Sequence, residues 1–248
     1  MVKQYFKPTN LGEALDLLRA DPKAQALAGG TFLMSSRFHA AQLSLVSLSD
    51  LLPRGMERKG TTLRIGAGAS FQDLLDSPLC PPVIASAASG MANRNIRNRA
   101  TVGGNIGADR SCASLPPVFI AGKARYLLAD GTIVSAEAWH SAAHHAHDEI
   151  IQAVEIDLPE YRVFAYGKYS RTSCDLAVIT CCVSASSTPD GALGDLRIAM
   201  GGLSLHPRLF REAESLLPLA DVRGSADFKR RRAAILLADV MASLGRQA

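Results

Sequence analysis

Two segments of the chain combine consecutive glycines with a hydrogen-bonding side chain. They are Ala28-Gly29-Gly30-Thr31 and Thr101-Val102-Gly103-Gly104-Asn105. Consecutive glycines after a strand let the backbone take positive φ and bring unobstructed N–H groups toward an anion, which is how peptide loops hold a diphosphate. Thr31 and Asn105 follow the glycines directly, where a phosphate or a ribose would sit. We therefore expect two turns that clamp one phosphorylated ligand.

Neither segment is one of the common nucleotide-binding motifs. The first lacks the third glycine of the Rossmann pattern, and no Gly-Lys-Ser or Gly-Lys-Thr follows either segment, as a P-loop requires. Taken singly, each is more often an ordinary tight turn. The interpretation as a ligand site depends on the two segments acting together.

The first diglycine segment is expected to follow a short strand in a small α/β unit. Asn10 is a candidate N-cap, and Glu13 three residues later completes a capping box. The helix should end near Pro22. Apolar runs predict strands at residues 26–28, directly before the glycines, and at 43–48.

The second diglycine segment is expected inside a longer α/β stretch. β-branched residues predict a strand at 61–67, and apolar spacing predicts helices at 71–75, 83–92 and 116–121. Asp130-Gly131 is a hairpin turn signal, and a strand should follow at 149–158.

The last third of the chain predicts a separate α+β layer. Strands are expected at residues 163–168, 176–185 and 193–201, followed by helices at 207–217 and 226–244. The whole chain is therefore predicted to be α/β (α+β), ending in a small domain with a three-stranded sheet and helices.

Composition describes a globular protein and excludes several function classes. Of 248 residues, 48% are hydrophobic and 20% charged, and the net charge of +4 is too small to imply a nucleic-acid surface. The basic run at residues 229–232 is interpreted as a solvated helix face. No apolar stretch has the length of a membrane span and the first residues lack a signal-peptide core, so we expect a cytoplasmic protein without a membrane span.

Cysteine and histidine patterns favour no metal site. The five cysteines are scattered without a CxxC pair, so reduced thiols are expected, with Cys181 and Cys182 as small buried hydrophobes. The histidine-rich residues 139–148 lack strand or helix periodicity, and we interpret them as an exposed loop.

The glycine segments and their flanks resemble a known family. Leu27-Ala28-Gly29-Gly30-Thr31-Phe32-Leu33 is similar to the first pyrophosphate loop, and Ile96-Arg97-Asn98-Arg99-Ala100-Thr101-Val102-Gly103-Gly104-Asn105-Ile106 to the second, of the FAD-binding (medium) subunit of the molybdenum hydroxylases. This is the family of xanthine dehydrogenase and aerobic carbon monoxide dehydrogenase, whose flavin domain is of the vanillyl-alcohol-oxidase type. The second motif is highly specific, and the resemblance runs essentially end to end.

The resemblance implies a set of FAD-binding residues. The diphosphate cradle would be made by backbone N–H groups of both segments, and Leu176 would lie near the flavin ring. Lys168 would be a cation near the ring, where positive charge stabilises reduced flavin; a solvent-facing strand lysine is an equal alternative. The implied cofactor-binding residues are Leu27, Ala28, Gly29, Gly30, Thr31, Phe32, Leu33, Thr101, Gly103, Gly104, Asn105, Ser114, Lys168 and Leu176.

The chain departs from the family pattern beside the second segment. Ser114 stands where the family usually has a ribose-binding Asp, and Asp109-Arg110 replace small residues. A serine keeps one hydrogen bond to a ribose hydroxyl but loses the charge-assisted acceptor, so weaker FAD binding is expected. Arg94, Arg97 and Arg99, just before the second segment, could serve a neighbouring subunit or the diphosphate, or be plain surface charge, which is the preferred interpretation for Arg94 and Arg99.

The resemblance also implies an activity and partners. Residues 1–158 would form the FAD-binding domain, in subdomains of about 1–55 and 56–158, and residues 159–248 the C-terminal domain. A molybdopterin-binding large subunit would oxidise the substrate, a [2Fe-2S] small subunit would pass electrons on, and the FAD of this chain would deliver them to an acceptor such as NAD. No catalytic side chain and no metal ligand are implied here. The alternatives are a flavin-free structural subunit and a stand-alone flavin oxidoreductase.

Overall fold

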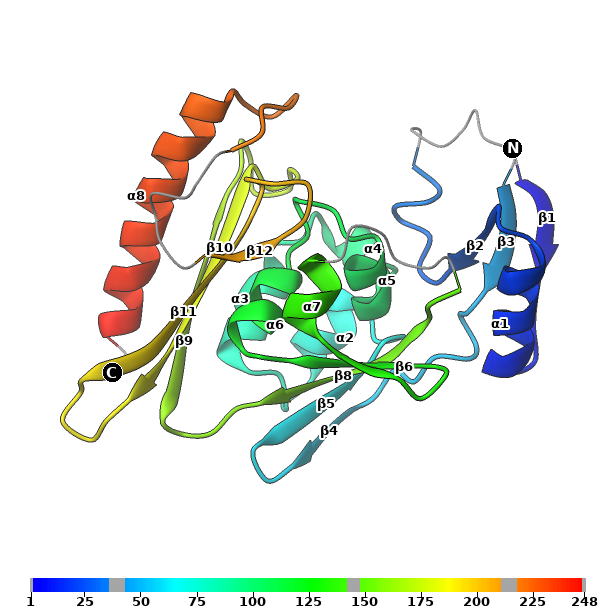
Figure 1. The fold of residues 1–248 in the computed structure, drawn as a ribbon, viewed down its shortest axis with the longest axis horizontal. Helices are drawn as coiled ribbons and strands as arrows, with labels where there is room; N and C mark the ends of the chain where they lie inside the picture. Colours follow the sequence, from blue (N-terminus) through cyan, green and yellow to red (C-terminus); the bar gives the residue numbers. More distant parts are fainter. Residues whose placement is uncertain (1, 36–42, 142–147, 211–217, 247–248) are drawn as a thin grey trace.

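Three β-sheets follow one another along the chain in the computed structural model, which describes residues 2–35, 43–141, 148–210 and 218–246 (Figure 1). The first unit is a three-stranded parallel sheet of order β1-β3-β2, on which one helix packs. Its elements are β1 (Val2–Phe6), α1 (Leu11–Ala20), β2 (Ala24–Leu27) and β3 (Leu43–Ser47). The predicted strand before the first glycine pair is therefore present, and it ends at Leu27.

The cap of α1 differs slightly from the predicted capping box. The Asn10 side chain accepts the Glu13 N–H at 2.9 Å, as expected. The Glu13 carboxylate, however, accepts the N–H of Thr9 at 2.7 Å and not that of Asn10. The helix end still gains two partners for backbone donors, which is what a capping box achieves.

The second unit is an antiparallel sheet of order β4-β5-β8-β6-β7, with helices gathered above one face (Figure 1). Its strands are β4 (Met56–Lys59), β5 (Thr62–Gly66), β6 (Arg125–Leu128), β7 (Ile133–Ser135) and β8 (Ile151–Asp157). Its helices are α2 (Phe71–Asp76), α3 (Pro82–Ser89), α4 (Arg94–Arg97), α5 (Val102–Gly107), α6 (Pro116–Ala121) and α7 (Ala136–Ser141).

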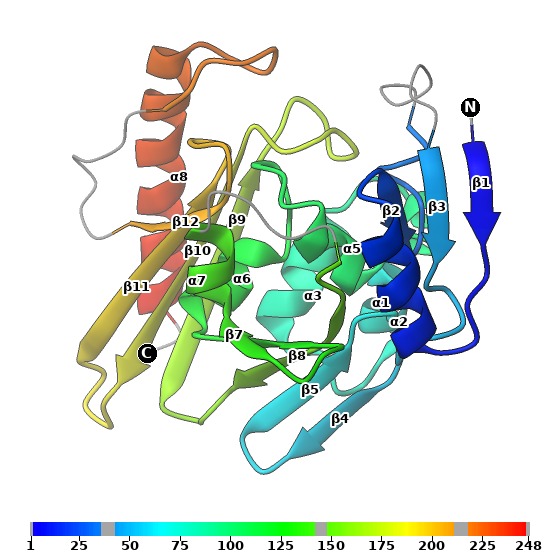
Figure 2. The same cartoon turned by 45° about the vertical axis from the view of Figure 1, so that its right-hand side comes forward.

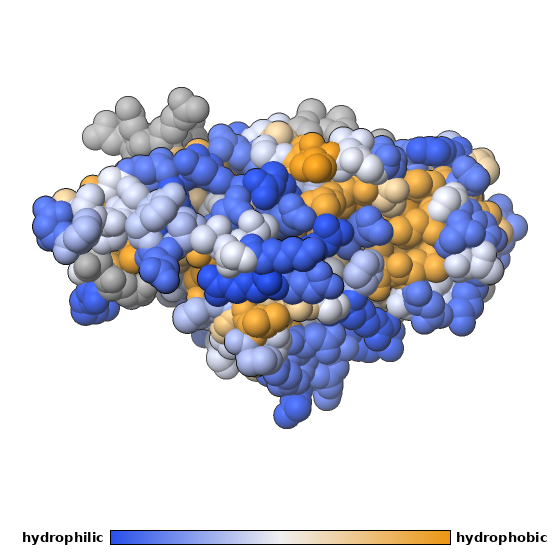
Figure 3. All heavy atoms as spheres, turned by 90° about the horizontal axis from the view of Figure 1, so that it is seen from below, coloured by the Kyte–Doolittle hydropathy of each residue, from blue (hydrophilic) through white to orange (hydrophobic). Residues whose placement is uncertain are grey.

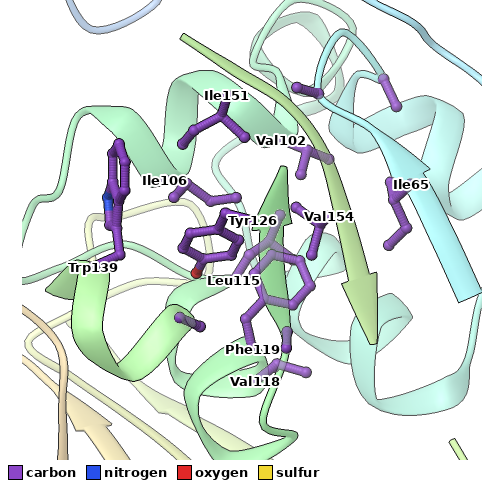
Figure 4. Packing of buried hydrophobic residues seen from close by; sticks show 14 of the residues in the cluster. Ile65, Val102, Ile106, Leu115, Val118, Phe119, Tyr126, Trp139, Ile151 and Val154 are labelled. Atoms are coloured by element: carbon purple, nitrogen blue, oxygen red, sulfur yellow. The ribbon is translucent and has the colours of Figure 1, made fainter. Parts of the chain in front are cut away.

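The main hydrophobic core lies between this sheet and its helices. Tyr126 on β6 is fully buried at its centre, edge-on to Phe119 of α6 and Trp139 of α7 (Figure 4). The ring centroids lie 6.1 Å and 6.0 Å apart, a geometry that aromatic pairs prefer. Val102 and Ile106 of α5 belong to the same buried cluster, so this core also joins the sheet to the helix that carries the second glycine pair.

The third unit is a sheet of order β12-β11-β10-β9 backed by the long helix α8 (Figures 1 and 2). Its elements are β9 (Arg162–Tyr169), β10 (Ile179–Ser187), β11 (Leu193–Gly201), β12 (Arg208–Phe210) and α8 (Ala226–Gly245). Alternating residues face opposite ways: Ala165 and Val183 pack with α8, while Tyr166 and Cys182 join the core of the second unit.

The predicted helix at 207–217 is wrong at its start. Arg208, Leu209 and Phe210 form a fourth strand, β12, which pairs with β11 at Ile198–Met200. The remainder, residues 211–217, lies outside the described residues. The proline that suggested a helix start instead precedes an edge strand, a position that proline also tolerates.

Two other local predictions are wrong because tertiary packing overrides local pattern. Trp139 and His140 were expected in an exposed loop, yet they belong to α7 and are 4% and 1% exposed. The neighbouring His144, His145 and His147 lie outside the described residues. Lys229, expected on a solvated face, is 1% exposed and donates to the carbonyls of Gly202 and Leu219.

The cysteine prediction is confirmed, since Cys181 and Cys182 are fully buried and all five thiols are free. The surface seen from below mixes polar residues with an apolar area toward the end that carries the first unit (Figure 3). Among the described residues, no helix combines the length and the apolar character needed to cross a membrane.

Candidate functional site

The first glycine segment is an open turn directly after β2. Gly30 has φ +73°, a conformation that favours glycine, and the Met34 N–H closes the turn onto the Gly30 carbonyl at 2.9 Å. The N–H groups of Gly29, Gly30, Thr31 and Leu33 make no hydrogen bond to any other described residue. Backbone donors left open on one short turn are what an anion-binding loop requires.

The second glycine segment is the start of a helix and not a turn. Thr101 is the N-cap of α5, and its hydroxyl accepts the Gly104 N–H at 3.1 Å. The other N–H groups are also used: Val102 donates to Ala69, Gly103 to Ala67 and Asn105 to Thr101. The expectation that backbone N–H groups of both segments are the main ligand donors is therefore not met here.

The glycines of the second segment allow close packing. A Cβ atom on Gly103 would lie 2.8 Å from the Ala67 Cβ, and one on Gly104 would lie 2.8 Å from the Thr101 hydroxyl oxygen. Neither glycine has positive φ; within the two segments only Gly30 does. In the first segment Gly30 thus has a conformational role, whereas both glycines of the second segment have a steric role.

The two segments touch each other. A Cβ atom on Gly29 would lie 1.7 Å from the Arg99 carbonyl oxygen, and the Arg99 Nε donates to the Gly29 carbonyl at 3.4 Å. Arg99 is exposed, as expected for surface charge, but it also contributes this contact. The fold therefore brings the two motifs together, as the clamp hypothesis requires.

A pocket of about 280 Å³ opens where the two segments meet. Its size is at the lower end for ligand pockets, so it accommodates part of a dinucleotide. Its wall carries two cations, Arg54 and Arg99, while its carboxylate, Asp73, is held in the capping box of α2 with Ser70. The pocket is lined by Ala28, Gly29, Leu48, Ser49, Leu52, Arg54, Gly68, Ser70, Asp73, Asn98, Arg99 and Thr101.

Asn105 and Ser114 do not line this pocket. The Asn105 Oδ1 accepts the Leu115 N–H at 3.2 Å, which leaves the side-chain amide as a donor. Ser114 is 4% exposed, and its hydroxyl approaches the buried phenol of Tyr166 without completing a hydrogen bond. Burial raises the pKa of Tyr166, so this phenol stays protonated.

Lys168 holds nearby backbone segments together through hydrogen bonds, in addition to carrying a positive charge. Its ammonium donates to the carbonyls of Gly90 at 2.6 Å, Asp175 at 2.8 Å and Ser173 at 3.2 Å. The alternative of a solvent-facing lysine is therefore wrong, and desolvation lowers the pKa of Lys168. With its three protons committed, the group acts on any ligand through charge alone.

Leu176 lies on the segment that Lys168 anchors, between β9 and β10. Its side chain is 55% exposed, an unusual exposure for a large apolar residue. The structure thus presents Leu176 outward on a segment whose backbone is fixed at both Ser173 and Asp175.

A buried polar cluster beside the second segment was missed from the sequence. The Asp109 carboxylate lies 2.5 Å from His140 Nδ1 and 2.6 Å from His206 Nδ1, and His140 Nε2 lies 3.0 Å from the Tyr126 hydroxyl. Burial and the charge of Asp109 raise the pKa of Tyr126, so this phenol stays protonated. Asp109 was noted only as a departure, because its histidine partners come from distant parts of the chain.

Comparison with known proteins identifies the family. The model of the FAD binding domain in molybdopterin dehydrogenase matches residues 1–159. The chain is 29% identical to the uncharacterized protein YgfM of Escherichia coli (strain K12), covering 98% of this chain and 96% of that protein. It is 28% identical to the xanthine dehydrogenase FAD-binding subunit of Escherichia coli O157:H7, covering 85% and 77%.

Solved structures share the whole fold. One chain of carbon monoxide dehydrogenase from Hydrogenophaga pseudoflava superposes with a TM-score of 0.89 at 25% identity, covering 100% of this chain and 99% of that one. This protein belongs to the family of FAD-binding domains in molybdopterin dehydrogenases. The predictions of the fold class, of FAD as cofactor and of an oxidoreductase subunit are confirmed.

Proposed function

We propose that this chain is the FAD-binding electron-transfer subunit of a molybdopterin-dependent hydroxylase or dehydrogenase complex. It would receive electrons from the [2Fe-2S] clusters of a small subunit and pass them to an external acceptor such as NAD. The observation that supports this most is the turn after β2, where the N–H groups of Gly29, Gly30, Thr31 and Leu33 are open and Gly29 contacts the second family motif at Arg99.

The two segments would hold the FAD diphosphate in different ways. The open N–H groups of Gly29, Gly30, Thr31 and Leu33 fit its oxygens, and the Phe32 backbone continues the same turn. Thr101 and Asn105 would contribute side-chain contacts, since the helix has used the backbone donors around Gly103 and Gly104. Leu27 and Ala28 would set the direction in which the turn leaves β2.

The ring and ribose ends would depend on three further side chains. Leu176, exposed on its anchored segment, fits an apolar contact to the flavin ring, and the charge of Lys168 behind that segment favours reduced flavin. Ser114 is the proposed ribose contact, and its burial beside Tyr166 agrees with weak binding there. FAD supplies the redox chemistry when bound, while these residues supply placement and charge.

The proposed partners are a molybdopterin-binding large subunit and a [2Fe-2S] small subunit, in the cytoplasm. Their support is that the relatives include a xanthine dehydrogenase FAD-binding subunit, matched over 77% of its length, and a chain of carbon monoxide dehydrogenase, matched over 99%. NAD as acceptor rests on the family resemblance alone.

Visible spectroscopy tests the cofactor assignment directly. The purified chain should carry bound FAD or take up added FAD, and a colourless protein that binds none would overturn the proposal in favour of a structural subunit. Anaerobic addition of NADH should bleach the bound flavin if NAD is the acceptor. Turnover of a substrate by the isolated chain would instead indicate a stand-alone oxidoreductase, whereas a relay subunit should co-purify with its two partners.

A further inference from the structure

Arg110, which pairs with no carboxylate of a described residue, lies beside the open turn that follows β2. The Arg110 guanidinium carbon lies 5.2 Å from the centroid of the Phe32 ring, and Phe32 is part of the turn with the free N–H groups. Arg110 is exposed, and no carboxylate or carbonyl of any described residue pairs with it. A guanidinium that rests on an aromatic face keeps its five donors directed to the side, available to an anion.

The backbone that carries Arg110 is fixed from below. Asp109 is 7% exposed and has φ +39°, an uncommon conformation for a residue with a side chain. Its carboxylate contacts His140 of α7 and His206 of the segment before β12, and His206 also contacts the Asp109 carbonyl at 3.1 Å. These contacts come from the second and third units of the molecule. They fix the position of Asp109, so that the next residue, Arg110, reaches the turn.

The local charges favour an anion at this place. Asp109 is already engaged by two histidines, so its carboxylate is directed away from Arg110 and into the interior. The open N–H groups of the neighbouring turn add positive partial charge. A cation beside several open backbone donors, with no carboxylate of a described residue paired to it, matches the chemistry of a diphosphate.

From this geometry we infer that Arg110 is a diphosphate-binding residue of the FAD site, and that Asp109, held by His140 and His206, is its positioning residue. The inference rests on the proposed function, since the diphosphate is that of FAD. Arg110 would supply a charged contact to the phosphates. In the same site the chain lacks a charged contact to the ribose, because Ser114 stands in place of the family's usual Asp.

Equilibrium titration of the apoprotein with FAD, and separately with ADP, tests the inference. Arg110→Gln should weaken both ligands about tenfold, because a charge-assisted hydrogen bond to phosphate is lost. It should also reduce the dependence of FAD affinity on salt. Arg110→Lys, which keeps the charge, should lose less, and Arg94→Gln, an exposed arginine on α4, is the matched control and should bind as the wild type does.

His206→Gln tests the positioning role without removing a fully buried group. Alone it should weaken FAD, and combined with Arg110→Gln it should add no further loss, because both changes act on one contact. Thermal unfolding of the apoproteins checks that Arg110→Gln leaves the fold intact.

The outcomes separate the two proposals. If the wild type binds FAD and Arg110→Gln binds it equally well, Arg110 only covers Phe32 and the inference is overturned while the proposed function stands. Additive effects of His206→Gln and Arg110→Gln would overturn the positioning role. A wild-type chain that binds neither FAD nor ADP would overturn the proposed function itself.

Discussion

The two glycine segments look alike in sequence and do different things in the structure. At Gly29-Gly30 the chain leaves a parallel strand, turns through positive φ and leaves its N–H groups open. At Gly103-Gly104 the chain enters a helix, and every N–H group from Val102 to Asn105 is used within the protein. A glycine pair therefore does not identify a backbone anion site by itself. What identifies it is whether the N–H groups remain free of hydrogen bonds within the protein.

Because of this difference, the two segments would have separate roles in the proposed FAD clamp. The first segment offers open backbone donors, while the second offers a closely packed surface whose backbone donors are already used, because it is a capped helix start packed on Ala67. Four substitutions separate these roles, beginning with the one that affects both segments at once.

Gly29→Ala should have the largest effect. The new methyl group would lie 1.7 Å from the Arg99 carbonyl oxygen, so the two segments must separate. We expect a loss of about 3 kcal/mol of unfolding free energy and of FAD binding, measured by urea denaturation and by flavin content. Gly107→Ala, with nothing within 4 Å of the added atom, is the control; equal stability of both variants would refute the contact.

Gly103→Ala tests the steric role of the second segment. The added methyl meets the Ala67 side chain at 2.8 Å, and we expect a cost of about 2 kcal/mol in urea denaturation. Ala67→Gly in the same chain should recover part of this loss, because it removes the atom in conflict. No recovery would show that the cost has another origin.

Gly30→Ala tests the conformational role of the first segment. The cost should be about 1 kcal/mol, because φ is +73° and the left-handed region is unfavourable for a side chain. Gly30→Asn should cost less, since asparagine tolerates this region better than alanine does. If both variants are as stable as the wild type, positive φ is not what selects glycine here.

Thr101→Ala should have the smallest effect of the four. It removes the hydroxyl that accepts the Gly104 N–H, which should cost about 0.5 kcal/mol of helix-cap stability in urea denaturation. It also opens one backbone donor in the second segment. Thr101→Ser keeps the cap and should retain wild-type stability in urea denaturation; a serine variant as unstable as the alanine one would exclude capping as the cause.

Local chemistry predicted the elements whose cause is local. The cap at Asn10, the strand before Gly29 and the Asp130-Gly131 hairpin all follow from neighbouring residues, and all are present in the structure. The family resemblance supplied the association of the two glycine segments, which spacing alone left open.

What the sequence could not supply depends on distant partners. Strand β12 exists because Leu209 and Phe210 pair with β11. Lys229 is buried because the carbonyls of Gly202 and Leu219 and the carboxylate of Asp221 surround it. His140 and His206 meet at Asp109 from separate units. In the candidate site, likewise, only the structure shows which N–H groups remain open.

Both faces of the four-stranded sheet are buried: α8 packs on one face, and the core of the second unit packs on the other. A fragment beginning near β9 would expose Tyr166, Cys182 and Ala199, which are packed against the second unit in the full chain. The rest of the chain would in turn expose the surfaces of α3 and α6 that contact this sheet. The third unit is therefore not expected to fold on its own, because one face of its sheet needs the core of the second unit as a partner.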